Sequence, residues 1–218
     1  MRGTSVAVLA SGGLDSAILV GDLARQGARV FPVYVRFGLV WEEVEQAGLT
    51  RFLEALNDPS IAPLRVFEMP IRAVYGRHWS TTGENVPGYE SPDEAVFLPG
   101  RNFLLVAQSA IWCCLNGVDQ LALAPLAANP FPDSTDAFFE ALQRAVNLAV
   151  AGRLQIVRPY QHLHKRAVLE RGVGMPLEHT FSCIHPVGGI HCGGCNKCAE
   201  RQAGFREAGI VDQTRYAR

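Results

Sequence analysis

The segment that most constrains the fold of this chain is a glycine-rich turn with the sequence SGGLDS at residues 11–16. It comes directly after an apolar run at residues 6–10, and apolar residues at helical spacing follow it. A buried strand, a tight turn and a helix are therefore expected in succession. Because the first amides of a helix have no intrahelical partners and carry the positive end of its dipole, the turn is predicted to form an anion site.

The side chains of the turn suit a bound phosphate. Gly12 and Gly13 allow the backbone to approach a ligand closely, and Ser11 and Ser16 add hydroxyl donors. Asp15 fits beside a phosphate only if a metal ion or an ammonium group lies between them. This suggests Mg²⁺ bridging Asp15 to a polyphosphate.

The turn differs from the two common phosphate loops. It lacks the Gly-Lys-Ser/Thr ending of the Walker loop and the G-x-G-x-x-G spacing of dinucleotide-binding folds. It resembles the SGGxDS pyrophosphate loop (PP-loop) of ATP pyrophosphatases, which activate an oxygen atom as its adenylate. The alternative is an ordinary Gly-Gly turn with a polar helix cap, as is common in α/β proteins.

Strand and helix patterns alternate along the chain. Strands are predicted at residues 6–10, 30–37, 64–69, 120–124 and 154–157. Helices are predicted at residues 14–25, 40–56, 102–116, 133–150 and 165–171, and a polar helix closes the chain. This alternation predicts an α/β fold with a doubly wound parallel sheet, which binds ligands at the carboxyl ends of its strands.

Three parts of this pattern carry further expectations. The helix at 102–116 is strongly apolar and is expected to be buried. The helix at 133–150 is expected to be capped by Asp133 or Ser134. Residues 70–97 break the alternation, and loops of this length are usually functional or disordered.

The size and charge of the chain limit its organisation and partners. With 218 residues, 48% of them hydrophobic, it can form one large domain with a small appendage. We expect the PP-loop domain at residues 1–178 and a metal-binding module at residues 179–218. The net charge of −1 predicts no bulk binding of nucleic acid or of an anionic membrane. No apolar stretch is long enough for a membrane span and no signal-peptide pattern is present, so a cytoplasmic protein is expected.

Four of the six cysteines follow a metal-binding spacing. Cys183, Cys192, Cys195 and Cys198 form the pattern C-x8-C-x2-C-x2-C, with two glycines allowing a tight turn inside it. Four thiolates predict a closed tetrahedral Zn²⁺ site, which is structural because no position stays open for a substrate. An iron–sulfur cluster is the main alternative.

Two other pairs of residues bear on this assignment. His185 and His191 are alternative ligands, although four cysteines already saturate one ion. Cys113 and Cys114 lie on the apolar helix at 102–116 and are expected to be core thiols, with sulfur transfer as the alternative.

The turn and the cysteine pattern together resemble the 7-cyano-7-deazaguanine synthase family of the queuosine-precursor pathway. Three segments between them are also similar to that family: FLPGRN at 97–102, FPD at 131–133 with the helix after it, and residues 159–165. The similarity spans about the whole chain in the family's order. It implies a homodimer that uses ATP, Mg²⁺ and Zn²⁺.

The resemblance also implies a reaction. The substrates would be 7-carboxy-7-deazaguanine and ammonia. ATP would activate the carboxylate as an acyl adenylate, ammonia would give the amide, and a second ATP would activate the amide oxygen for loss to the nitrile. The PP-loop and Mg²⁺ would stabilise charge on the departing pyrophosphate.

Site residues follow from the same resemblance, position by position. The nucleotide-binding residues would be Ala10, Ser11, Gly12, Gly13, Leu14, Asp15 and Ser16. The residues expected to act in catalysis are Asp15, Ser16, Arg101 and Lys165. Arg101 would clamp a phosphate or the carboxylate, with a surface ion pair as the alternative. Lys165 would neutralise phosphate charge, with a solvated helix position as the alternative. Asn102 and Asp133 are each either ligand contacts or helix caps.

The chain departs from the family in one place that matters. Family members carry an acidic-aromatic-Ser-Gly run before Y-P-D, whereas this chain has AANP at residues 127–130. The acidic residue, a natural partner for a guanine-like edge, is absent, and the loop at 70–97 is also unlike the family's. An alternative function is therefore a divergent ligase that joins a deazaguanine-type or other acid to a different amine, such as one on a protein.

Two alternatives come from other functional classes. A tRNA-thiolating PP-loop enzyme would need a catalytic cysteine pair near the turn and a basic RNA-binding surface, and the net charge of −1 argues against it. A non-enzymatic nucleotide-binding module would carry a degenerate turn, whereas all the PP-loop positions at 11–16 are filled.

Overall fold

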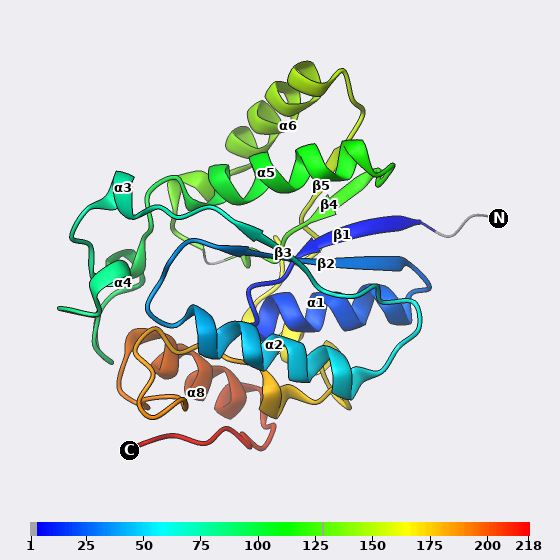
Figure 1. Cartoon of the computed structure of the whole chain (residues 1–218). Coiled ribbons are helices and arrows are strands. Elements are labelled where there is room, and N and C mark those ends of the chain that lie inside the picture. Colours follow the sequence, from blue (N-terminus) through cyan, green and yellow to red (C-terminus); the bar gives the residue numbers. More distant parts are fainter. Residues whose placement is uncertain (1–3, 128) are drawn as a thin grey trace.

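The computed structural model describes residues 4–127 and 129–218. Its centre is a five-stranded parallel sheet with the strand order β3-β2-β1-β4-β5 (Figure 1). The strands are β1 Ser5–Leu9, β2 Arg29–Arg36, β3 Arg65–Glu68, β4 Gln120–Ala122 and β5 Gln155–Val157. Because the chain builds outward from β1 first on one side and then on the other, the sheet is doubly wound, as predicted.

Helices cover both faces of the sheet (Figure 1). The long helices are α1 Leu14–Arg25, α2 Glu42–Leu56, α5 Arg101–Leu115, α6 Asp136–Val150, α7 Lys165–Arg171 and α8 Asn196–Ala208. Helices α1 and α2 lie on one face and α5 and α6 on the other, while α7 packs against both α1 and α8. The short helices are α3 Arg72–Tyr75, α4 Trp79–Thr82, η1 Asp93–Val96, η2 Pro132–Ser134 and η3 Leu177–His179.

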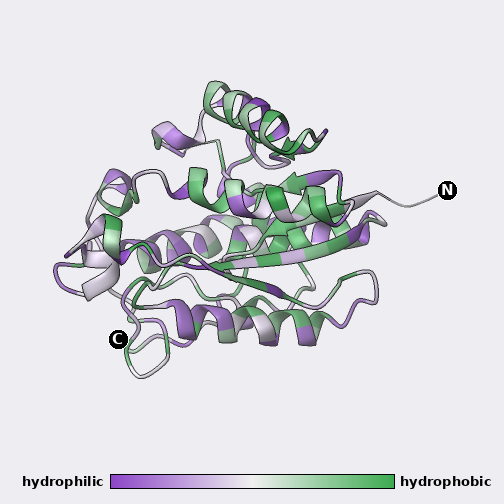
Figure 2. Cartoon of the chain, turned by 45° about the horizontal axis from the view of Figure 1, so that its top comes forward, coloured by the Kyte–Doolittle hydropathy of each residue, from purple (hydrophilic) through white to green (hydrophobic). Residues whose placement is uncertain are grey.

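Alternate residues of the central strand enter two different cores. Val6 and Val8 pack with residues of α1, whereas Ala7 and Leu9 pack with residues of α5. The strands are therefore hydrophobic on both faces, while the covering helices carry hydrophilic stripes toward solvent (Figure 2). Among the described residues, no helix has both the length and the hydropathy that crossing a bilayer requires.

The expectation that the helix at 102–116 is buried is wrong for the side of the helix that faces away from the sheet. Helix α5 buries Val106 and Ala110 against the sheet, but Phe103 is 50% exposed and Leu115 is 80% exposed. The reason is its position in an outer layer, where a helix has only one face toward the core.

The predicted caps of the helix at 133–150 are also wrong. Helix α6 begins at Asp136, and the hydroxyl of Thr135 accepts from the Phe138 amide at 3.3 Å. Asp133 instead accepts from the backbone N–H of Asn102 at 3.0 Å, so it caps α5 from outside. The side-chain amide of Asn102 donates to the Asp133 backbone carbonyl at 2.9 Å and does not cap its own helix. These bonds tie η2 to the first turn of α5.

The segment at 70–97 is ordered into the short helices α3, α4 and η1. It also changes the start of α2, which was predicted at Val40. The Val40 amide donates to the Ser80 carbonyl at 3.0 Å, so the chain is held by α4 and α2 begins only at Glu42.

The C-terminal segment returns to the body of the fold. After α8, the chain runs back so that the Ala217 amide donates to the carbonyl of His191 at 2.8 Å. Cys183 and Cys198 belong to the same hydrophobic cluster as Ala7 of β1. The division into parts at residues 178 and 179 remains a prediction.

Candidate functional site

The carboxyl ends of β1 and β4, where the strand order reverses, open on a cavity of about 610 Å³. A second cavity, of about 190 Å³, shares part of its wall. Both cavities are lined by Ser11, Gly13, Asp15 and Arg101. Doubly wound sheets bind their ligands at this position.

The structure brings most of the predicted site residues to these cavities. The larger cavity is lined by Ser11, Gly13, Leu14, Asp15, Arg101 and Lys165. Ser16 lines the smaller one. Ala10, just before the turn, and Gly12, within it, line neither cavity, and the Ala10 amide donates to the Val33 carbonyl of β2 at 2.8 Å.

The turn is braced by one of its own side chains. The hydroxyl of Ser16 accepts from the Ser11 amide at 3.1 Å, lies 3.1 Å from the Ser11 hydroxyl and donates to the Gly13 carbonyl at 3.3 Å. Gly13 is the N-cap of α1 and supplies no side-chain cap. The first-turn amides of α1 are therefore left for an anion at the cavity wall.

Replacement of Gly12 by alanine is expected to destabilise the protein and displace the turn. Gly12 has φ +84°, and a Cβ there would lie 2.9 Å from the Glu45 carbonyl oxygen. The left-handed conformation alone costs about 1–2 kcal/mol for an alanine, or several degrees of Tm, and the clash adds to it. Thermal unfolding and ATP affinity of Gly12→Ala measure both effects.

Gly117→Ala is the matched control for this variant. Gly117 also has a positive φ, of +67°, but a Cβ there would meet nothing within 4 Å. It should therefore show the conformational cost without the loss of ATP affinity. Equal Tm and equal affinity in the two variants would show that close packing beneath the turn is not required.

Lys165, the first residue of α7, reaches the turn. Its ammonium donates to both carboxylate oxygens of Asp15, at 2.9 and 2.7 Å, and lies 2.7 Å from Oε1 of Glu200 on α8. The sequence predicted a metal ion or an ammonium group beside Asp15, and Lys165 supplies an ammonium group there. The Lys165 side chain is only 15% exposed, so it is not a solvated helix residue.

These groups hold one another in their charged forms. Burial lowers the pKa of Lys165, but the carboxylates of Asp15 and Glu200 outweigh it and keep that pKa above its usual value. Burial raises the pKa of Glu200, but the ammonium groups of Lys165 and Lys197 outweigh it and lower the pKa to about 2. At neutral pH this wall of the cavity is a chain of alternating charges.

Arg101 and Glu45 line the larger cavity from helices on opposite faces of the sheet. The Nε atom of Arg101 is buried and has no hydrogen-bond partner among the described residues, so this donor is left for a ligand. The Glu45 carboxylate accepts from the Tyr34 hydroxyl at 2.7 Å. Burial raises the pKa of Glu45 to about 8, although the Arg101 charge opposes the rise.

Sequence reasoning missed several residues of the cavity wall: Trp41, Glu45, Trp79 and Glu200. One signal for Glu45 was available, because Glu45, Leu49 and Phe52 fall on the same buried face of α2 at helical spacing. A carboxylate on such a face is unusual. Trp79 stacks on Trp41 with ring centroids 5.7 Å apart, but it comes from the segment without periodicity, which offered no signal.

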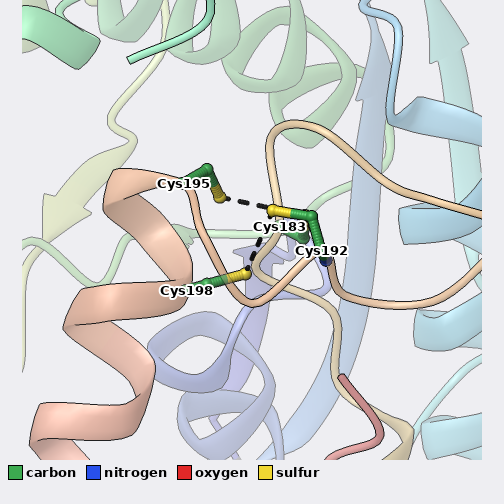
Figure 3. A group of neighbouring side chains, drawn as sticks. All are labelled: Cys183, Cys192, Cys195 and Cys198. Atoms are coloured by element: carbon green, nitrogen blue, oxygen red, sulfur yellow. Dashed lines mark hydrogen bonds between the residues drawn. The ribbon is translucent and has the colours of Figure 1, made fainter. Parts of the chain in front are cut away.

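The four predicted metal ligands converge (Figure 3). The Sγ atoms of Cys183 and Cys195 are 3.8 Å apart, and those of Cys192 and Cys198 are 3.9 Å apart. All four sulfurs lie within 4.8 Å of one another, and all four residues are buried. A tetrahedral ion with Zn–S bonds of about 2.3 Å separates its ligand sulfurs by about 3.8 Å, so the residues fit one zinc ion. An iron–sulfur cluster distributes its four cysteines over two or four irons, so the four sulfurs do not all lie this close together.

Backbone amides point at these sulfurs. The amides of His185 and Cys192 donate to Sγ of Cys183, and the Gly194 amide donates to Sγ of Cys192, each at 3.3 Å. Hydrogen bonds to sulfur favour the thiolate, which is the ligating form. The donor set thus suits a metal-bound cluster.

The cluster also lies at the start of a helix. Cys195 is the N-cap of α8 and Cys198 lies in its first turn, so the positive end of the helix dipole faces both. His191 has a different role, because its Nε2 accepts from the Ser182 amide at 3.1 Å. Among the described residues, the group of converging ligands contains cysteines alone.

Residues just before Cys183 fasten the cluster to the turn. The Phe181 amide donates to the Gly12 carbonyl at 2.8 Å. Arg201 of α8, which is 1% exposed, donates to the hydroxyls of Thr180 at 2.9 Å and Ser182 at 3.2 Å. Disruption of the cysteine cluster is therefore expected to disturb the PP-loop.

The remaining cysteines lie on α5, away from both cavity walls. Cys113 is fully buried, and burial, with a smaller effect of Cys114, raises its pKa to about 12. This confirms Cys113 as a core thiol, whereas Cys114 is half-buried. Such a raised pKa suppresses the thiolate that sulfur transfer requires.

Known proteins resemble this chain in sequence and in fold. A family model described as "Queuosine biosynthesis protein QueC" matches residues 5–209. A 7-cyano-7-deazaguanine synthase of Thiobacillus denitrificans is 30% identical over an alignment of 224 residues, gaps included, that covers 97% of this chain and 97% of that protein. A 7-cyano-7-deazaguanine synthase of Pseudomonas fluorescens is 28% identical over an alignment of 222 residues, gaps included, that covers 96% of each chain.

A solved structure shares the fold at low sequence identity. It is a predicted subunit of a tRNA methyltransferase from Methanocaldococcus jannaschii, with a TM-score of 0.50 and 16% identity over 77% of this chain and 73% of that one. This likeness concerns the fold alone.

The match of the family model over nearly the whole chain confirms the resemblance seen in the sequence. The chain therefore belongs to the QueC family of queuosine biosynthesis proteins.

Proposed function

We propose that this protein is an ATP-dependent carbon–nitrogen ligase that converts 7-carboxy-7-deazaguanine and ammonia, through the amide, to 7-cyano-7-deazaguanine. The observation that carries this proposal is the meeting of the PP-loop, Arg101 and Lys165 in the wall of one cavity, in a chain of the QueC family. Relatives of this chain are named as synthases of that nitrile.

The first half of the reaction makes the carboxylate reactive. A carboxylate is a poor electrophile because its oxygen is a poor leaving group. Attack of that oxygen on the α-phosphorus of ATP gives the acyl adenylate and releases pyrophosphate. The free amides of the first turn of α1 suit the pyrophosphate, and the Arg101 guanidinium suits a phosphate or the carboxylate of the acid. Ammonia then attacks the carbonyl carbon, AMP leaves and a proton is released.

The second half repeats the activation on the amide. The amide oxygen attacks the α-phosphorus of a second ATP and releases pyrophosphate. Loss of AMP, together with the two amide protons, leaves the nitrile. The same turn serves both halves, because both develop negative charge on a departing pyrophosphate.

Lys165 and Asp15 have complementary tasks in this proposal. The Lys165 ammonium balances phosphate charge at the turn, and Glu200 holds it there. Asp15 is the carboxylate that would bind Mg²⁺ together with phosphate oxygens. Proteins usually bind this ion through one or two carboxylates, and substrate phosphates supply further ligands. When bound, Mg²⁺ neutralises charge on the polyphosphate.

For the cysteine cluster we propose a structural Zn²⁺. Its sulfur spacing, its amide donors and its absence from the lining residues of both cavities support this role. Metal analysis is the test: a colourless protein with about one zinc per chain is expected. A coloured protein that contains iron and sulfide would contradict it.

The first experiment is a mass-spectrometric assay of the purified protein with ATP, Mg²⁺, ammonium and 7-carboxy-7-deazaguanine. The nitrile is expected, with two ATP converted to AMP and pyrophosphate for each nitrile. Protein without ammonium serves as the control and should stop at the adenylate. If the acid is not consumed at all, the proposed substrate is wrong.

A second candidate is a ligase that joins this or a similar acid to another amine. The observation that favours it is the wall formed by Asn129, Pro130 and Phe131, at the segment where the family carries an acidic residue; Ala128 of this segment lies outside the described residues. Accumulation of the adenylate or the amide without nitrile in the same assay would favour this candidate. The tRNA-thiolating alternative is less supported, since no cysteine lies among the described lining residues of either cavity. The homodimer and the cytoplasmic location remain predictions.

A further inference from the structure

One buried carboxylate in the wall of the larger cavity has no cationic partner among the described residues. The carboxylates in this wall are Asp15, Glu45, Asp93, Glu200 and Glu207. Asp15 and Glu200 pair with Lys165, while Asp93 and Glu207 are exposed. Glu45 is only 7% exposed, yet among the described residues no lysine or arginine nitrogen lies within 4.0 Å of it. A buried carboxylate without such a partner is costly to maintain, which points to a use in binding.

The carboxylate of Glu45 is held in a fixed place. Tyr34 of β2 donates to its Oε2 at 2.7 Å. Its backbone oxygen and Cγ pack so closely on the PP-loop that a Cβ at Gly12 would lie 2.9 and 3.1 Å from them. A ligand bound to Glu45 is therefore also bound beside the turn that takes the phosphates.

The surroundings of Glu45 suit a flat, partly polar ligand. Trp41 and Trp79 contribute stacked rings to the cavity wall, and such rings favour planar heterocycles. Arg101 contributes a buried Nε donor without a partner among the described residues. The cavity thus combines a hydrogen-bond acceptor, aromatic surface and a guanidinium, and the acceptor and guanidinium come from helices on opposite faces of the sheet.

We propose that Glu45 recognises the hydrogen-bond-donating edge of the heterocyclic acid, while Arg101 faces the acid's carboxylate beside the PP-loop. An acceptor for that edge then comes from α2, whereas the described wall at residues 129–131 offers no acidic side chain. This inference rests on the proposed function, because it names the residue that selects that function's acid.

The test compares Glu45→Gln with Glu43→Gln, using 7-carboxy-7-deazaguanine as the probe. Glutamine keeps one side-chain oxygen that can accept from Tyr34, but its NH₂ group replaces the oxygen that would accept from the ligand. Glu43 is on the same helix and exposed, so it controls for the chemical change. Glu45→Gln should raise KM for the acid about 10²-fold and leave the Kd for ATP unchanged, and Glu43→Gln should match the wild type.

The wild-type protein supplies a second measurement that does not depend on a variant folding. An analogue of the acid without its exocyclic amino group lacks one donor. The wild type should bind it about 10²-fold more weakly than the acid, whereas Glu45→Gln should discriminate much less. Equal binding of the acid and the analogue by the wild type would overturn the inference.

The pH dependence provides a readout that a purely structural role would not move. Tyr34 on β2, Glu42 on α2 and Arg101 on α5 are the titratable groups that face Glu45, whose pKa is about 8 without ligand. Binding through the carboxylate requires the proton to leave, so KM for the acid should fall as pH rises from 6 to 8, by roughly 50-fold, and level off above 8. Glu45→Gln should lose this slope.

The outcomes separate this inference from the proposed function. If the wild type turns over the acid but Glu45→Gln keeps the same KM and pH slope, the inference is wrong and the function stands. If the wild type does not turn over the acid, both fall together. Loss of ATP binding in a folded Glu45→Gln variant would also contradict the inference, because Glu45 would then contribute to nucleotide binding.

Discussion

Asp15→Ala is expected to abolish turnover while the protein stays folded. Asp15 lies in the PP-loop at the cavity wall and is bound by the Lys165 ammonium through both of its oxygens. Its removal takes away the carboxylate proposed to bind Mg²⁺ and leaves Lys165 paired with Glu200 but no longer with Asp15. Loss of a group that acts on charge developing in the transition state lowers kcat by about 10²–10³-fold or more. Rates of AMP formation with the acid and ammonium measure the effect.

Asp136→Ala is the matched control for this variant. Asp136 also lies in the first turn of a helix and also pairs with a cation, Arg158, at 2.8 Å, but it is on the surface outside both cavities. Its loss should leave kcat unchanged. Both variants should unfold within a few degrees of the wild type, because partly exposed ion pairs add about 1 kcal/mol or less. Activity that persisted in Asp15→Ala would show that the assignment of the loop is wrong.

Cys195→Ser is expected to lower the metal content and the stability together. Serine is a good N-cap residue, so the substitution should not weaken the start of α8 itself. It removes one of four converging sulfurs, and a structural metal contributes directly to folding free energy. We expect a loss on the order of 4 kcal/mol and a fall in Tm on the order of 10 °C. Zinc analysis and thermal unfolding give both quantities.

The loss of activity in Cys195→Ser should follow from the loss of structure. The Phe181 amide joins the segment before the cluster to the Gly12 carbonyl, so the PP-loop loses support when the cluster does. Cys114→Ser is the control, since Cys114 is half-buried on α5 and outside the cluster. It should keep its zinc and its activity. A Cys195→Ser protein with normal Tm and no activity would instead mark the cluster as catalytic.

Local patterns were sufficient to predict the fold class. The apolar strand, the glycine turn and the amphipathic helix at the N-terminus are short-range features, and the same holds for the alternation that follows. Errors arose where a residue's partner lies elsewhere in the chain. Asp133 was expected to cap the helix after it but bonds to Asn102, thirty-one positions earlier. Val40 was expected to begin α2 but is held by Ser80.

The site was predicted unevenly for the same reason. The PP-loop and the cysteine pattern are continuous motifs; most residues of the PP-loop line the cavities, and the four cysteines converge. Trp79 and Glu200 belong to no motif, and they join the cavity only because the segment at 70–97 and helix α8 fold over the carboxyl ends of the strands. Burial of Glu45 beside the turn likewise depends on how α2 packs.

The sequence by itself therefore determined the doubly wound sheet, the glycine turn between β1 and α1 and the group of four converging cysteines, because each depends on residue types at short, regular spacing. Only the tertiary structure decided that Lys165 meets Asp15 across 150 positions, and that Glu45 and Arg101 share one cavity wall. Contacts of this kind depend on the packing of distant helices. The electrostatics that follow, such as the raised pKa of Glu45, depend on burial that no local pattern encodes.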